Sequence, residues 1–276
     1  MNGKLRHIHY LEKYYSKPDI KDVELIAIDE FSVKKGHKYM TVVMDLVSGR
    51  VIYAAEGKDA ACLDAFWQRV RRNKVKIKAV AMDMSPAYLS AVVNNIPEAK
   101  IVHDHFHIIK AFNDELSELR RDIFRDEKDL NKRELIKGTR WLLLKNSENL
   151  ETDDEKQRLQ DALNVNKPLA IAYYLKEDLG LLWEQNSKKE AEIFLNKWVK
   201  TAYASGLFRL RKFANSLLAH RSALLNWYDY PISTGPLEGL NNKIKVMKRD
   251  ASGYRDMEFF KLKIYSLHVK KYALTG

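Results

Sequence analysis

The sequence has a single cysteine, Cys62, in 276 residues. One cysteine excludes a disulfide within the chain and a zinc site built from several of its own cysteines. Its place in a helical pattern makes it most simply a small apolar side chain that is buried or half-buried. No apolar run approaches the roughly 18 residues that a membrane helix needs, and the opening residues MNGKLR lack the apolar core of a secretory signal. We therefore expect a cytoplasmic protein without a membrane-spanning helix.

Glycine and proline are scarce in the middle of the chain. Residues 104–230 contain three glycines and one proline, whereas the other 149 residues contain eight glycines and five prolines. Apolar residues recur there at spacings of three and four, as in Ile109, Phe112, Leu116, Leu119 and Ile123. The pattern predicts that this stretch is mostly helical, with a polar break near residues 146–157.

The first hundred residues alternate between strand and helix patterns. Three apolar runs joined by short turns predict an antiparallel meander at residues 23–31, 38–47 and 51–55. Strands are also predicted at 77–82 and 99–103. Each follows a predicted helix, at 59–72 and 86–95 respectively, which favours parallel crossovers. After a loop at 230–236, helices are predicted at about 236–248 and 256–271.

Positive charge is in excess. Lys and Arg total 48 against 37 Asp and Glu, which gives a formal net charge of +11. Such an excess favours a polyanionic partner, either nucleic acid or an anionic membrane surface, although a merely basic soluble protein has the same balance.

Two aspartates close buried strands. Asp29 ends the first strand and Asp83 ends the fourth, and these strands are neighbours in a sheet ordered 3-2-1-4-5. Adjacent carboxylates repel one another unless a cation lies between them, and divalent Mg²⁺ or Mn²⁺ prefers carboxylate oxygens. The alternative is that either aspartate only caps a turn or a helix.

A third acid, Glu238, lies near the start of the helix that follows Pro236. Asn242, Lys245 and Arg249 follow it on the same helical face. An acid followed by amide and cationic groups suits a metal ion beside a phosphate backbone. The alternative is a first-turn glutamate that complements the helix dipole, followed by solvated basic side chains.

Four sequence blocks resemble those of a known family. They are AIDEFS at 27–32 with GHKY at 36–39, DMSPAY at 83–88, DHFHIIK at 104–110 and GPLEGLNNKIK at 235–245. In this order they resemble the ISL3 family of insertion-sequence transposases, which have a DDE catalytic triad on an RNase H-like core. The resemblance covers about residues 20–270.

The resemblance implies a fold and a division into domains. The fold class is α/β, an RNase H-like mixed five-stranded sheet of order 3-2-1-4-5 with a large all-helical insertion before the last catalytic helix. The expected parts are an N-terminal helical or extended segment (1–20), the first part of the core (21–109), the helical insertion (110–229) and the C-terminal core helices (230–276).

The resemblance also implies a chemistry. Asp29, Asp83 and Glu238 would be both the catalytic residues and the ligands of two Mg²⁺ (or Mn²⁺) ions that promote DNA cleavage and strand transfer. His107 of the DxxH pattern, Asn242, Lys245 and Arg249 would contact DNA. The partners would be double-stranded transposon ends and target DNA, with the protein a homodimer when synapsed on them.

One departure from the family lies at the N-terminus. Fuller members carry a cysteine-rich zinc domain and a helix-turn-helix segment ahead of the catalytic core, whereas here the first acid is residue 29. We therefore expect a truncated chain with salt-sensitive, largely non-specific DNA binding. Another RNase H-like nuclease or resolvase, or a non-catalytic DNA-binding relic, are the alternative functions.

The helical insertion offers further candidates for DNA contact. Its candidate phosphate contacts, for which solvated arginines are the alternative interpretation, are Arg120, Arg121, Arg209, Arg211 and Arg221. Its tryptophans are most simply core or packing residues, and the alternative is that one of them stacks on a base: Trp183, Trp198 and Trp227.

Overall fold

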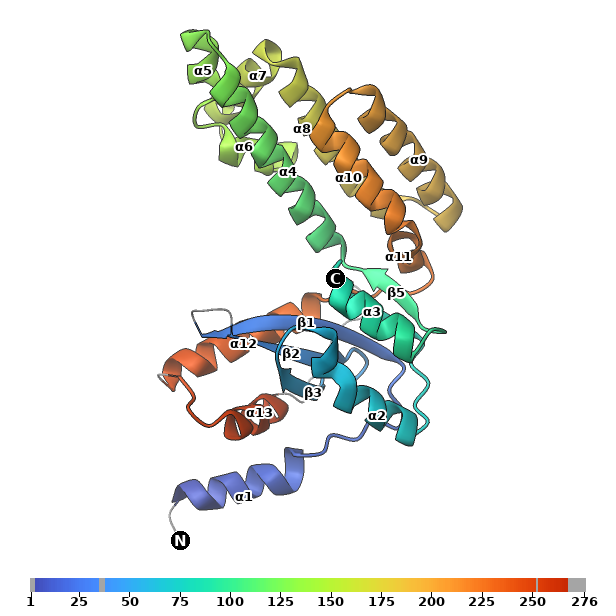
Figure 1. Cartoon of the computed structure of the whole chain (residues 1–276). Helices are drawn as coiled ribbons and strands as arrows, with labels where there is room; N and C mark the ends of the chain where they lie inside the picture. The colour runs from blue at the N-terminus through green and yellow to red at the C-terminus, as the bar shows by residue number, and fades with distance from the viewer. Residues whose placement is uncertain (1–2, 35–37, 252, 268–276) are drawn as a thin grey trace. The chain divides into compact units, whose positions relative to one another are not determined.

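The computed structural model describes residues 3–34, 38–251 and 253–267 (Figure 1). The chain forms two compact units. Unit 1 comprises Met1–Asp104 and Asp229–Gly276, and unit 2 comprises His105–Tyr228. The whole of unit 2 is therefore inserted into the sequence of unit 1.

Unit 1 contains a mixed five-stranded sheet. Its strands are β1 (Leu25–Lys34), β2 (Lys38–Asp45), β3 (Val51–Glu56), β4 (Ala79–Met82) and β5 (Lys100–His103). Their order is β3-β2-β1-β4-β5, with β1 antiparallel to β2, β2 antiparallel to β3, and β4 parallel to both β1 and β5. The predicted α/β RNase H-like fold class, including its strand order, is confirmed.

Helices cover both faces of this sheet. Alternate residues of β1, such as Ile26 and Ile28, belong to a buried core with α2 (Asp64–Arg72) and α3 (Pro86–Asn95), which supply Phe66, Trp67 and Val92 among others. Residues of the opposite parity face α12 (Gly235–Asp250) and α13 (Met257–Ser266), as the edge-to-face contact of Phe31 with Phe260 shows. The period of two in β1 thus decides which residues reach α12.

Most predicted elements of unit 1 are present within a few residues. The helix predicted at 59–72 begins as a 3₁₀ turn, η1 (Ala60–Leu63), where Cys62 is half-buried. An N-terminal helix, α1 (Gly3–Tyr15), packs against α13. Residues 36–37 of the first sequence block and residues 268–271 of the predicted last helix lie outside the described residues.

Unit 2 is mostly helical and contains no strand among its described residues, as predicted for 104–230. Its α-helices are α4 (His105–Asp126), α5 (Leu130–Ile136), α6 (Arg140–Leu144), α7 (Asp153–Val165), α8 (Lys167–Gly180), α9 (Lys188–Ala204), α10 (Phe208–Ala219) and α11 (Arg221–Leu225). Short 3₁₀ turns join some of them: η2 (Ser147–Asn149), η3 (Leu181–Glu184) and η4 (Asn226–Tyr228). Among the described residues, none of the helices is long and apolar enough to cross a membrane.

Local sequence signals account for several helix starts in unit 2. Thr152 and Ser187 cap α7 and α9 by accepting hydrogen bonds from the backbone N–H of Glu155 and Glu190, three residues on. The core of the unit is aromatic where Phe112, Trp198 and Phe213 meet edge to face. Trp198, one of the three tryptophans singled out from the sequence, is therefore a core residue, and its Nε1 donates to the carbonyl of Leu175.

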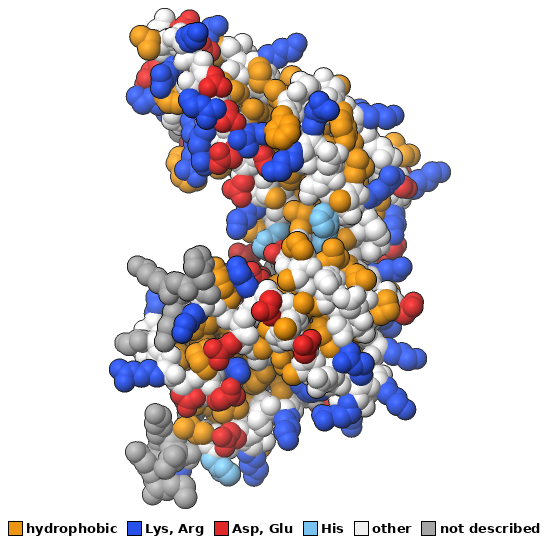
Figure 2. Space-filling model, viewed as in Figure 1, with side chains coloured by type: hydrophobic (Ala, Val, Ile, Leu, Met, Phe, Trp, Pro, Cys, Tyr) orange, Lys and Arg blue, Asp and Glu red, His pale blue; other side chains and the backbone are white. Residues whose placement is uncertain are grey.

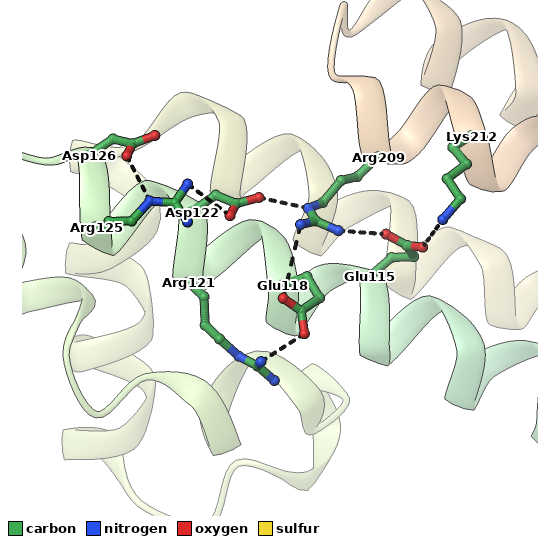
Figure 3. Close-up of polar contacts among 8 residues, drawn as sticks. All are labelled: Glu115, Glu118, Arg121, Asp122, Arg125, Asp126, Arg209 and Lys212. Carbon is green, nitrogen blue, oxygen red and sulfur yellow. Dashed lines mark hydrogen bonds and ion pairs between the residues drawn. The ribbon is translucent and has the colours of Figure 1, made fainter.

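An ion-pair network ties α10 to α4 within unit 2 (Figure 3). Arg209 on α10 donates to Asp122 Oδ2 at 2.8 Å and to Glu115 Oε2 at 3.2 Å, and its third nitrogen lies 4.0 Å from Glu118. Lys212, one turn further along α10, also reaches Glu115. Arg209 is thus bound by carboxylates of its own unit, which does not favour its role as a phosphate contact.

Candidate functional site

The candidate site lies in unit 1, within β1 and at the carboxyl end of β4. The prediction that Asp29 ends the first strand is wrong, because β1 continues its pairing with β2 as far as Lys34. β1 and β4 pair in parallel, with Ala27 opposite Ala81. The parallel pairing ends there, and its register continued by two residues would set Asp29 beside Asp83, which directly follows β4. Both side chains are half-buried, and each aspartate lies two residues beyond the Ala27–Ala81 pair that ends the parallel ladder.

Asp83 also has a structural role. Its Oδ1 accepts a hydrogen bond from the backbone N–H of Ser85 at 2.9 Å and so forms the turn that leads into α3. This is the capping role that the sequence left open. The bond occupies one carboxylate oxygen, so turn formation and ligand binding by Oδ2 are compatible.

The helix that carries Glu238 is fixed by a carboxylate that the sequence analysis did not select. Asp104, 3% exposed, follows β5, and its Oδ2 accepts bonds from the backbone N–H and the hydroxyl of Thr234 at 2.7 and 2.6 Å. Thr234 is the N-cap of α12, and its carbonyl accepts the N–H of Glu238 at 2.9 Å. The available signal was that Asp104, like Asp29 and Asp83, is an acid near the end of a buried strand.

Asn241 is the α12 residue that contacts the strand carboxylates. It is 4% exposed, and its Nδ2 donates to Asp29 Oδ2 at 2.8 Å. Its Oδ1 is buried and has no hydrogen-bond partner among the described residues. Asn241 therefore holds one carboxylate of the site and presents an unsatisfied oxygen beside it.

Asn241 was not predicted as a site residue, whereas the predicted residues of α12 are all exposed: Glu238, Asn242, Lys245 and Arg249. Lys245 Nζ lies 3.4 Å from Asn242 Oδ1, so this pair forms an outward polar strip. Lys248 instead faces the sheet, where its Nζ donates to the carbonyls of Ser32 and Val33. α12 thus lies over β1 with one edge in contact with the strand and the predicted DNA-facing residues accessible to solvent.

The donor set suits a hard divalent ion. Among the residues that the structure describes, no group of three or more His, Cys, Asp or Glu side chains is close enough to hold a metal. The candidate site nevertheless offers oxygen ligands, namely the carboxylates of Asp29 and Asp83 and the unsatisfied amide oxygen of Asn241. An unpaired buried oxygen is costly, and a bound cation would satisfy it. In its chemistry, this set fits Mg²⁺ or Mn²⁺.

Several predicted DNA contacts belong to unit 2. His107 lies in the first turn of α4, half-buried, with its ring 5.6 Å from that of Phe106. Of the candidate arginines, Arg121 pairs with Glu118 at 2.7 Å and Arg221 pairs with Glu192. Like Arg209, these two have carboxylate partners within their own unit.

Comparison with known proteins covers most of the chain. The model of the ISL3 family, described as transposase, matches residues 26–264. The transposase of insertion sequence element IS1001 of Bordetella parapertussis is 37% identical over 251 residues, which are 90% of this chain and 62% of that protein. The transposase of IS1557 of Mycobacterium tuberculosis is 28% identical over 253 residues, 83% of this chain and 56% of that protein.

A shorter match has a different name. A Lactococcus lactis protein named ATP-dependent protease is 34% identical over 126 residues, which are 45% of this chain, so it does not outweigh the match to the transposases. This chain spans about 60% of the length of the curated transposases that it resembles.

Proposed function

This chain belongs to the ISL3 family of insertion-sequence transposases. From that membership we propose that it cleaves and joins DNA at the site formed by β1, β4 and α12 of unit 1. The reaction would be metal-dependent phosphoryl transfer. Asp29, Asp83 and Glu238 would be its catalytic carboxylates, and double-stranded DNA its substrate.

One observation carries the proposal. Asp29 and Asp83 each lie two residues after the paired Ala27 and Ala81 of two parallel strands, and the helix bearing Glu238 is bonded to Asp29 through Asn241. A structural reading explains Asp83 by its turn with Ser85, but it gives no reason for a second carboxylate beside it or for a buried amide oxygen without a partner. Metal binding explains all three features.

Each residue would have a separate task. Asp29 and Asp83 would hold two Mg²⁺ or Mn²⁺ ions, together with Glu238 from α12. When bound, such ions lower the pKa of a water molecule and neutralise charge on the reacting phosphate. Asn241 would keep the Asp29 carboxylate in one orientation, and Lys245 and Arg249 would contact DNA phosphates next to the site.

The proposed sequence of reactions uses one site twice. Water would first attack the phosphodiester at the end of the element and release a 3′-OH. That hydroxyl would then attack a phosphodiester of target DNA, so the number of phosphodiester bonds is conserved in the joining step. Two chains would act together when two DNA ends are synapsed.

The test is strand transfer with pre-cleaved DNA ends and Mg²⁺ or Mn²⁺. Asp29→Asn removes one negative charge from the proposed metal site while preserving the size of the side chain, and it should abolish both cleavage and joining. Asp64→Asn is the matched control, since Asp64 is an exposed aspartate in the first turn of α2. It should retain the activity.

Three outcomes would contradict parts of the proposal. Metal-dependent cleavage by the Asp29→Asn chain would exclude the assigned site. Cleavage without joining would indicate another RNase H-like nuclease. DNA binding without either reaction in the unsubstituted chain would indicate a non-catalytic relic.

A further inference from the structure

A surface of unit 2 combines three arginines with an exposed tryptophan. Arg120 and Arg121 belong to α4, and Arg140 and Trp141 begin α6, which packs against α4. We call these four residues the arginine–tryptophan patch. Residues 120–145 contain nine Lys and Arg against five Asp and Glu. Figure 2 shows Lys and Arg side chains gathered, with acids among them, over this part of unit 2.

The guanidinium group of Arg120 lacks a hydrogen-bond partner at one of its nitrogens. Its Nε is buried and has no hydrogen-bond partner among the described residues. Burial lowers the pKa of Arg120, and the positive charges of Arg121 and Arg140 lower it further. A half-buried guanidinium beside two like charges is stabilised by an anion that supplies acceptors.

Arg140 and Trp141 provide an exposed cation and an exposed ring. Trp141 is 66% exposed, although large aromatic side chains usually lie in the core. The Arg140 guanidinium carbon lies 4.7 Å from the centre of the Trp141 ring, a cation–π distance that restrains the charged group. No ion pair between described residues involves Arg120 or Arg140.

Other arginines of unit 2 differ in this respect. Arg125, also on α4, pairs with both Asp122 and Asp126 (Figure 3). Arg209 on α10 is bound by carboxylates of α4. Within the patch, Arg121 pairs with Glu118 of its own helix, so Arg120 and Arg140 are the arginines of the patch that remain available for an external anion.

We propose that the arginine–tryptophan patch binds the phosphate backbone of double-stranded DNA. The proposal rests on the proposed function, which makes DNA the substrate of this chain. Planar guanidinium groups bind phosphate oxygens through two parallel hydrogen bonds, and the Trp141 ring offers an apolar surface for the adjacent deoxyribose. This contact positions DNA and reads no sequence.

The test measures the salt dependence of binding to a short DNA duplex by fluorescence anisotropy, from about 50 to 200 mM salt. The full chain carries Asp29→Asn throughout, so that no cleavage disturbs the titration. Each phosphate contact that is lost should reduce the slope of log K against log salt by about 0.9. Arg140→Gln should lower the slope by one such step, and Arg120→Gln with Arg140→Gln by two.

A matched control separates this patch from general charge. Arg125→Gln removes the same charge from α4, but at a residue already paired with carboxylates, and it should leave the slope unchanged. Trp141→Ala should weaken binding at every salt concentration without altering the slope. Because Arg140 and Trp141 are exposed, these variants should fold, and thermal unfolding checks this.

Two results would contradict the proposal that the arginine–tryptophan patch binds DNA. The first is an unchanged slope in the Arg140→Gln chain or an equal loss in the Arg125→Gln chain. The second is a patch that binds anionic lipid vesicles but does not affect DNA binding. Neither result concerns cleavage. The proposal for the patch can therefore be wrong while the Asp29→Asn experiment supports the proposed function, and the proposed function can be wrong while the patch binds DNA.

Discussion

Two consecutive asparagines of α12 lie in opposite environments. Asn241 is buried against Asp29, whereas Asn242 is exposed and its side chain accepts a hydrogen bond from Lys245. An amide that donates to a carboxylate oxygen restrains the direction of the remaining lone pairs. A carboxylate that is already held in one orientation loses less conformational freedom when it binds a metal ion.

We predict that Asn241→Ala lowers the affinity for Mn²⁺ by about 10- to 100-fold, the usual effect of removing a group that orients a ligand. Isothermal titration calorimetry measures this affinity without requiring DNA cleavage. Asn242→Ala is the control, and it should bind Mn²⁺ as the unsubstituted chain does. Equal affinities in the two variants would show that Asn241 does not orient Asp29.

The sequence could not distinguish between these two asparagines. Residues three and four positions after Glu238 lie on either side of it around the helix, and both neighbour it on the surface. The sequence analysis selected Asn242 because it begins a strip with Lys245 and Arg249. The contact with Asp29 depends on the rotation of α12 over β1, which packing at Leu237, Leu240 and Ile244 determines.

At the scale of elements, most of unit 1 could be predicted because its signals are local. Strands of unit 1 have a period of two or short apolar runs, turns contain glycine, and Ser85-Pro86 marks the start of α3. The bonds of Asp104 to Thr234 could not be predicted, because the two residues are 130 positions apart. No local sequence pattern predicts a hydrogen bond between residues that lie on either side of a long insertion.

These bonds lead to a prediction about the position of α12. Thr234→Val removes the hydroxyl donor and leaves a buried carboxylate with one hydrogen bond fewer, which should cost about 1–3 kcal/mol of unfolding free energy in urea. Thr234→Ser retains the hydroxyl and should remain close to the original stability. If α12 also shifts, Mn²⁺ affinity falls in the valine variant and is restored in the serine variant. Identical stability in both variants would contradict the role of the hydroxyl.

The Arg209 network predicts how stability depends on pH. The hydrogen bond from Arg209 lowers the pKa of Asp122 below its ordinary value of 3.8. The folded state therefore gains stability that is fully present above this value and is lost as the pH falls through the lowered pKa. Arg209→Gln should reduce unfolding free energy by about 1 kcal/mol at neutral pH, since the network is partly exposed.

The difference between the two chains should close as the pH falls below 3.8. Urea unfolding at a series of pH values measures this difference. Arg211→Gln, on the same helix but exposed and without a carboxylate partner among the described residues, should show no such dependence. A difference that stays constant through the acid range would mean that Asp122 is not the group that responds to Arg209.

At the scale of the whole molecule, the proposed site and the helical insertion belong to different units. Asp29, Asp83, Asp104, Glu238 and Asn241 all belong to unit 1, although the sequence that encodes them is interrupted by residues 105–228. The sheet has helices of its own unit on both faces. Because Asp104 bonds to Thr234, the two ends of the interruption are close together in space.

We therefore predict that unit 1 folds without unit 2. Replacing residues 105–228 by a short Gly-Ser linker should leave a soluble chain whose circular dichroism shows the sheet and fewer helices, and which unfolds in one cooperative step. The shortened chain should still bind Mn²⁺, and Asp29→Asn within it should weaken that binding. Its DNA affinity should have a smaller salt slope than the full chain, because Arg120 and Arg140 have been removed. An aggregated or unfolded product would mean that the sheet needs unit 2 to complete its core, and a full-sized salt slope would mean that the basic residues of α12 and α13 alone hold DNA.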